Sequence, residues 1–128
     1  MSKWANSNLM DNGLNYLKNN GNRIVLCAGQ PASYAEATTN YPSGKALGHA
    51  TITSAAFTLA DGDTSGRKIT VAQQTGIAVD ATGTCDHIAI VDTVGAALLL
   101  VTTVTGQVVT AGNTAQINSY KDEIAAPA

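Results

Sequence analysis

The stretch Asp86-His-Ile-Ala-Ile-Val-Asp92 decides the fold class of this chain, because isoleucines recur along it at every second position. Ile88 and Ile90 are two residues apart, so both point to the same face of an extended strand. A second stretch, Lys68-Ile-Thr-Val-Ala72, places its two branched aliphatic residues on one face in the same way. Period-two alternation is typical of a strand with one buried face. Both stretches therefore predict β-strands whose branched residues face the core.

Further strands are expected on both sides of these stretches, separated by turn-forming residues. Sixteen threonines, fourteen of them after residue 50, suit half-exposed strands. Turns are expected at Asp61-Gly-Asp-Thr-Ser-Gly66, at Thr105-Gly106 and at Ala111-Gly-Asn113. Strands that recur about every 8 to 15 residues between such turns are typical of an antiparallel sandwich or barrel. The expected strands span residues 47–53, 56–60, 67–73, 84–92, 97–104 and 114–124.

The first 22 residues differ in composition from the rest of the chain, since they hold seven of its ten asparagines. Their apolar residues fall on one stripe of a helix, formed by Leu9 or Met10, Leu14 and Leu17. We predict a single domain, with residues 1–7 as a candidate extended contact arm, residues 8–20 as an α-helix and residues 23–128 as a β-rich body. The helix is expected to pack across one open face or end of that body.

A short apolar strand and a second helical turn are expected after the helix. The length and β-branched content of Arg23-Ile-Val-Leu-Cys-Ala28 favour a strand covered on both faces. Ser33-Tyr-Ala-Glu36 fits a capping box and predicts one or two helical turns that end near Thr39. The predicted fold class is therefore mainly β, an antiparallel β-sandwich or barrel with one N-terminal α-helix and a short second helical turn.

The composition limits the classes of function. The chain has 128 residues, of which 45% are hydrophobic and 12% charged, with a formal net charge of −2 and a pI near 5.4. A weakly acidic chain has no electrostatic basis for gripping a nucleic-acid backbone. The polar segment Met1–Asn6 lacks the apolar core of a secretory signal. The longest apolar run, Val94–Val101, is far shorter than the roughly 20 residues of a membrane-spanning helix.

The loop that begins at Asp61 matches the start of an EF-hand calcium loop. Asp61, Asp63 and Ser65 supply oxygens at the first, third and fifth positions, and Gly66 stands at the sixth. Ala72 occupies the twelfth position, where an EF-hand has a bidentate glutamate. Two carboxylates and one hydroxyl make a poor cage for a cation that takes about six to eight oxygens. We expect a structural turn, with Asp61, Asp63 and Ser65 as a weak calcium candidate, and no other metal or cofactor.

Cys85 and His87 raise the question of nucleophilic catalysis, because a thiol and an imidazole two apart on a strand share a face. Catalysis also needs an orienting partner and oxyanion donors in a pocket, and no recognised frame for them occurs in the sequence. We therefore predict no catalytic residue and no enzymatic activity.

Cys27 and Cys85 are 58 positions apart. A cytosolic origin favours two free, buried thiols, and a disulfide is left open.

Charged residues are scarce over most of the predicted β-rich body. The 52 residues between Lys68 and Lys121 contain three charges, Asp80, Asp86 and Asp92. Exposed strands of a monomer usually carry mixed charges that prevent edge-to-edge association. The scarcity is compatible with burial against copies of the chain or a larger partner, and equally with a soluble threonine-rich face. The candidate interface residues lie near the N-terminus and are Trp4, Asn6 and Asn8.

Several motifs, in order along nearly the whole chain, carry a family resemblance. They are Asn8-Leu-Met-Asp11, Tyr34-Ala-Glu-Ala37, Phe57-Thr-Leu-Ala-Asp-Gly-Asp-Thr-Ser-Gly-Arg-Lys68, Asp86-His-Ile-Ala-Ile-Val-Asp92, Leu98-Leu-Leu-Val-Thr102, Thr110-Ala-Gly-Asn-Thr114 and Lys121-Asp-Glu-Ile-Ala125. The series resembles small structural proteins encoded in the virion gene modules of tailed bacteriophages. These motifs are turns and strands, so the resemblance carries over no catalytic or metal-binding residue.

The resemblance implies a non-enzymatic part of the virion. We expect a capsid decoration or cement protein that binds the outer capsid surface and stabilises the shell, with a neck, tail or fibre-base component as the alternative. A carbohydrate-binding adhesin module is a further alternative, with Trp4, Tyr34, Tyr41 and the Asp61–Gly66 loop as its candidate platform. The expected partners are the major capsid protein or other virion proteins and copies of the chain, with no nucleic acid and no membrane. The expected location is the virion, after synthesis in the host cytoplasm.

Overall fold

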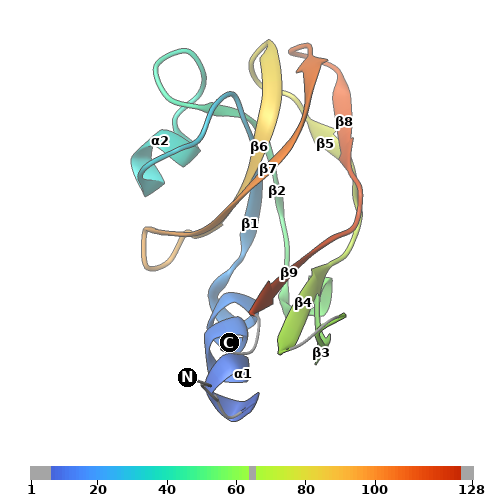
Figure 1. Ribbon diagram of the computed structural model, residues 1–128. Coiled ribbons are helices and arrows are strands. Elements are labelled where there is room, and N and C mark those ends of the chain that lie inside the picture. Colours follow the sequence, from blue (N-terminus) through green and yellow to red (C-terminus); the bar gives the residue numbers. More distant parts are fainter. Residues whose placement is uncertain (1–6, 64–65, 125–128) are drawn as a thin grey trace, which may run out of the picture.

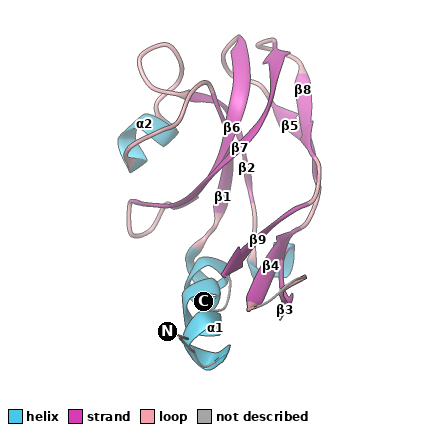
Figure 2. Cartoon of the chain, in the orientation of Figure 1, coloured by secondary structure: helices cyan, strands magenta, loops and turns pink. Residues whose placement is uncertain are grey.

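The computed structural model describes residues 7–63 and 66–124, which form mainly antiparallel β-strands (Figure 1, Figure 2). The helical elements are α1 (Ser7–Asn20), α2 (Tyr34–Thr38) and the short 3-10 turn η1 (Ser54–Ala56). The strands are β1 (Arg23–Cys27), β2 (Ala46–Thr51), β3 (Phe57–Asp61), β4 (Arg67–Val71), β5 (Gln74–Ala78), β6 (Gly83–Asp92), β7 (Ala97–Val109), β8 (Thr114–Ile117) and β9 (Tyr120–Ile124).

These strands form three sheets that pack as two layers. One sheet has the order β2-β1-β6-β7, the second β3-β4-β9 and the third β5-β8. In Figure 1 the four-stranded sheet runs through the middle of the molecule, with the two smaller sheets on one side and α2 on the other. The predicted mainly β class is confirmed, and the described strands form an open sandwich, not a closed barrel.

The central strands β1 and β6 of the four-stranded sheet are buried on both faces, because their apolar residues point alternately to the two faces. The face toward the smaller sheets belongs to the main core, to which β1 and β6 contribute Ile24, Leu26, Ile88 and Ile90. The opposite face belongs to a second cluster near α2, which includes Val25, Cys27, Ala37, Ala89 and Val91. The predicted burial of β1 on both faces is therefore confirmed, and so are the core-facing isoleucines of β6.

Helix α1 closes one end of the sandwich, as the sequence predicts (Figure 1). Leu14 and Leu17 are buried in the main core, and the helix contacts β3, β4 and η1. The Gly21 N–H donates to the Leu17 carbonyl at 2.8 Å and ends the helix. A β-carbon at Gly21 would lie 2.8 Å from Cγ2 of Ile90, so only glycine lets the chain pass this close to β6. Among the described residues, no helix has the length and apolar character to cross a membrane.

Helix α2 confirms the predicted second helical turn. The Ser33 hydroxyl accepts a hydrogen bond from the Glu36 N–H at 3.2 Å, which satisfies one of the free donors at the helix start. The helix ends at Thr39, whose N–H donates to the Ala35 carbonyl. Because α2 contacts all four strands of the large sheet, this short helix covers the second core cluster.

Two features of the second layer differ from the sequence prediction. Strand β5 is not predicted from the sequence, because its residues do not alternate between apolar and polar. In the structure only Ile77 of this strand is buried, and Gly76 has a φ of 65°. Its pairing with β8 makes it a strand. The single strand expected over 114–124 is two strands, since β8 pairs with β5 whereas β9 pairs with β4 in another sheet.

The turn predicted at Thr105-Gly106 is also wrong, because β7 continues through it to Val109. The start of β6 reaches this far along the sheet, and Thr84 lies opposite Val108. The pairing of β6 with β7 has one register shift between Cys85 and His87, and Gly106 lies in this irregular part of β7. At 13 residues, β7 is thus the longest described strand.

Candidate functional site

The loop between β3 and β4 is a hairpin whose carboxylates are paired with basic side chains. Asp61 Oδ1 lies 2.6 Å from Nη1 of Arg67. Asp63 Oδ1 lies 2.6 Å from Nζ of Lys68, and Lys121 of β9 contacts its other carboxylate oxygen. Basic side chains that hold both carboxylates compete with a divalent cation. The geometry therefore favours the structural turn over a calcium site.

Ser65, the third member of the calcium candidate, lies outside the described residues. Within residues 7–63 and 66–124, no three His, Cys, Asp or Glu side chains are close enough together to hold a metal ion. The two described members of the calcium candidate, Asp61 and Asp63, are both ion-paired.

Cys85 and His87 do not share a face of β6, so that prediction is wrong. Cys85 packs in the main core together with Ile88, although an odd and an even position of a regular strand face opposite ways. The pairing of β6 with β7 shifts register between Cys85 and His87, as at a β-bulge. His87 lies opposite Cys27, which belongs to the second cluster on the other face. The thiol and the imidazole therefore cannot act together on one substrate atom.

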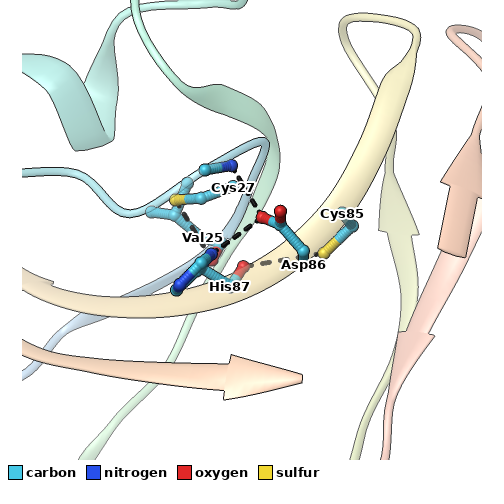
Figure 3. Close-up of polar contacts among 6 residues, drawn as sticks. Val25, Cys27, Cys85, Asp86 and His87 are labelled. Atoms are coloured by element: carbon cyan, nitrogen blue, oxygen red, sulfur yellow. Dashed lines mark hydrogen bonds and ion pairs between the residues drawn. The ribbon is translucent and has the colours of Figure 1, made fainter. Parts of the chain in front are cut away.

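Both cysteines are free, buried thiols, as expected for a reducing environment. Burial raises the pKa of Cys27 to about 12 and also raises the pKa of Cys85. The Cys85 thiol lies 3.6 Å from the His87 carbonyl oxygen, and the Cys27 thiol lies 3.9 Å from the Val25 carbonyl oxygen (Figure 3). Neither sulfur is a thiolate at neutral pH, so both behave as small apolar residues.

Asp86 fastens the loop after β1 to the neighbouring strand β6. Its Oδ1 accepts a hydrogen bond from the Gly29 N–H at 2.7 Å and lies 2.8 Å from Nδ1 of His87 (Figure 3). These contacts, first that with His87 and then that with Gly29, hold the pKa of the Asp86 carboxyl below its ordinary value. Gly29 has a φ of 94°, a conformation that favours glycine, so the loop is shaped to present its N–H to the carboxylate. The cluster has a structural role.

The residues proposed as a carbohydrate-binding platform are spread over the molecule. Tyr34 is half-buried against the second core cluster, and Tyr41 lies in the loop that follows α2. The β3–β4 hairpin lies at the opposite end of the molecule (Figure 1). Trp4 lies outside the described residues. The described members of the set therefore do not form one surface.

The interface residues predicted near the N-terminus remain predictions. Trp4 and Asn6 lie outside the described residues. Asn8 lies in the first turn of α1, and its side chain is likewise outside the described part.

Strand β7 is the candidate interaction surface that the structure adds. It is the last strand of the four-stranded sheet, and in the described part of the chain no strand pairs with its other edge. None of its 13 residues is fully buried. The 28 residues from Thr93 to Tyr120 contain no Asp, Glu, Lys or Arg. Natural edge strands are usually short, charged or interrupted by proline, because a long neutral edge pairs readily with other chains.

Two grooves open along β7, one near each end. The first, of about 430 Å³, lies between α1 and the start of β7, and Leu14, Tyr16 and Leu98–Leu100 supply most of its lining. The second, of about 660 Å³, lies between the end of β7 and β8, with Val104 and Val108 on its β7 wall. The first groove is mainly apolar, whereas threonine, asparagine and glutamine side chains make up much of the lining of the second.

Strands β7 and β9 contribute three buried polar side-chain atoms that have no hydrogen bond of ordinary geometry. They are Thr102 Oγ1, Tyr120 OH and Asp122 Oδ2. Burial raises the pKa of Asp122 and of Tyr120, and the Thr102 hydroxyl partly offsets the rise for Asp122. Buried polar atoms without good partners are destabilising, so these atoms lower the stability of the fold.

The sequence carried one signal for this surface, the scarcity of charge between Lys68 and Lys121. That signal did not show which of the uncharged strands forms the sheet edge, because the order of strands depends on distant pairings. No known protein family, curated protein or solved structure matches the chain.

Proposed function

We propose that the chain is a structural protein of a bacteriophage virion, and that it decorates the outside of the capsid and stabilises the shell. The observation that carries the proposal is the edge of β7 that no described strand pairs with, which is long and uncharged and has an apolar groove at its start. A protein that holds other proteins together needs an exposed surface whose burial against a partner is favourable in free energy. The resemblance of the motif series to small virion proteins of tailed phages supports the same role.

The mechanism is mechanical. The central strands of the four-stranded sheet are buried on both faces, so the domain presents its surface in a preformed state and little ordering entropy is lost on binding. Bound across the joint between capsid subunits, it adds an interface that must break before the shell opens. A standard interface buries about 1,600 Å² in total, and many copies on one particle multiply a modest individual affinity.

A neck, tail or fibre-base component would use the same kind of surface at another place in the virion. The number of copies in a particle separates the two positions. A shell is covered by many copies, whereas a ring at the neck or tail contains about a dozen or fewer.

The first experiment is to count copies in purified virions by quantitative mass spectrometry, with the major capsid protein as the internal standard. Hundreds of copies are expected for a decoration protein. A count near a dozen would move the protein to the neck or tail, and its absence from virions would overturn the proposal.

A second experiment tests attachment through the N-terminal arm. Full-length protein and a variant lacking residues 2–6 are pelleted with particles that lack this protein. We expect the truncated protein to bind much more weakly, because one buried aromatic such as Trp4 can carry about 2 kcal/mol or more of a small interface. Equal binding would show that the arm adds nothing to the contact made by the β-rich body, to which β7 belongs, and no binding by either would place the protein off the capsid.

A further inference from the structure

Most of the exposed large hydrophobic side chains among the described residues lie near the two ends of β7. The described residues include four exposed large hydrophobic side chains, Tyr16, Tyr41, Val94 and Val108. Val94, which is 90% exposed, lies in the turn that precedes β7, and Val108, which is 69% exposed, lies near its end. Tyr16 lines the groove at the start of β7. Three of the four therefore lie near the ends of β7.

The backbone of β7 is also available along this edge. From Leu100 to Thr103 the strand pairs with β6 in unbroken register. In a regular antiparallel strand, alternate residues direct their N–H and C=O groups to opposite sides. Half of the groups in this segment therefore point away from β6, and no described strand receives them.

The absence of charge on this edge bears on which partner can pair with it. An acidic or basic arm would find no complementary side chain on β7, since its 13 residues carry no charge. A second copy of the same strand meets no like charge, and like charges directly opposite each other are what normally prevents such pairing. We propose that β7 pairs antiparallel with β7 of a second copy, about a two-fold axis near the middle of the strand.

A two-fold axis makes the surface its own complement. Antiparallel pairing brings the Val94 end of one copy to the Val108 end of the other, so the two most exposed valines cover each other at both ends of the interface. The two four-stranded sheets then form one sheet that continues across both copies. This inference rests on the proposed function, in which β7 is a surface for association with other proteins. It names a second copy of the chain as the first partner of that surface.

Analytical ultracentrifugation of the full-length protein tests the pairing. We expect a dimer, and we expect Thr103→Lys and Val108→Lys each to weaken it by about tenfold or more, because charge on a sheet edge opposes pairing. Thr51→Lys is the matched control, since Thr51 is an exposed threonine on β2, the opposite edge of the same sheet. Circular dichroism melting shows that each variant folds.

Cross-linking tests the antiparallel direction. The single variants Val94→Cys and Val108→Cys are mixed and treated with a thiol-specific cross-linker that has a short spacer. We expect dimers in the mixture and few in either variant alone, whereas parallel pairing would cross-link each variant with itself. The native thiols are buried and react slowly, so the wild-type protein is the blank.

A monomeric wild type, or a dimer that is unaffected by lysine at both positions of β7, overturns the pairing. Neither result says whether the protein is present in virions, so the copy count in purified virions tests the proposed function independently. Conversely, a β7 dimer that is absent from purified virions would leave the pairing standing and overturn the virion role.

Discussion

Strands β6 and β7 are neighbours in one sheet, yet they are built for different tasks. β6 lies between β1 and β7, its residues 88–92 are all buried, and two of its aspartates accept hydrogen bonds from backbone N–H groups. β7 is paired on one edge, none of its residues is fully buried and it has no charge. The burial of β6 indicates that it contributes more to the stability of the fold, whereas β7 leaves the edge at which we propose association.

The largest expected effect comes from truncating a pair of residues that face each other across these strands. Ile90 of β6 is fully buried, and its partner Leu100 of β7 is half-buried. We expect Ile90→Ala to cost roughly 2–5 kcal/mol of unfolding free energy, because it leaves a cavity in the main core. Leu100→Ala should cost clearly less, as measured by urea denaturation. Equal losses would show that β7 is as important to the core as β6.

The turn that joins the two strands provides the next effect. Asp92 Oδ1 accepts hydrogen bonds from the N–H groups of Val94 at 2.9 Å and Gly95 at 3.1 Å. Asp92→Ala removes both bonds and should cost about 1–3 kcal/mol. Asp92→Asn keeps an acceptor oxygen and serves as the control. If both variants melt like the wild type, the carboxylate does not hold the turn.

Acid should destabilise the protein through Asp86. Its native pKa lies below the ordinary value of 3.8, so the stability it adds is fully present above that value and is lost as the pH falls through the native pKa. Melting temperatures measured from pH 7 to pH 2 should therefore fall less steeply in Asp86→Asn than in the wild type. Parallel curves for the two proteins would rule out a contribution from this carboxylate.

Asp122, which lines the groove beside β7, should have the opposite effect. Burial raises its native pKa above the ordinary value of 3.8, so the native state favours the protonated form. The ionised carboxylate thus lowers stability at neutral pH, and the penalty disappears as the pH falls below the unfolded pKa. Asp122→Asn should raise the melting temperature slightly at pH 7 and leave it unchanged near pH 3. A lower melting temperature at pH 7 would contradict this.

The smallest effect is expected from calcium. Asp86 of β6 is held by a backbone N–H, whereas Asp61 and Asp63 of the β3–β4 hairpin are held by basic side chains. Melting temperatures in EDTA and in millimolar calcium should agree within about a degree, because a ligand raises stability only if it binds the native state. A rise of several degrees would show that the hairpin binds the ion.

The predictions that succeeded depend on short-range pattern. Alternation identified the buried strand β6, and the apolar run of β1 predicted burial on both faces. The Ser33 cap and the stripe of α1 predicted both helices closely. Such features are readable because a residue and its neighbours two to four positions away decide which face of a strand or helix is buried.

The predictions that failed depend on distant pairing. The register shift beside His87 placed the imidazole and the Cys85 thiol on opposite faces. The single strand expected over residues 114–124 is divided between two sheets. β5 became a strand only because β8 lies beside it.

The mainly β class, the buried strands, both helices and the neutral stretch after residue 92 follow from local spacing and composition. Three features depend on the folded arrangement: β7 is the sheet edge, β8 and β9 join different sheets, and the aspartates have partners. The physical reason is that strand order and side-chain partners are set by hydrogen bonds between segments far apart in the chain, which no local pattern encodes.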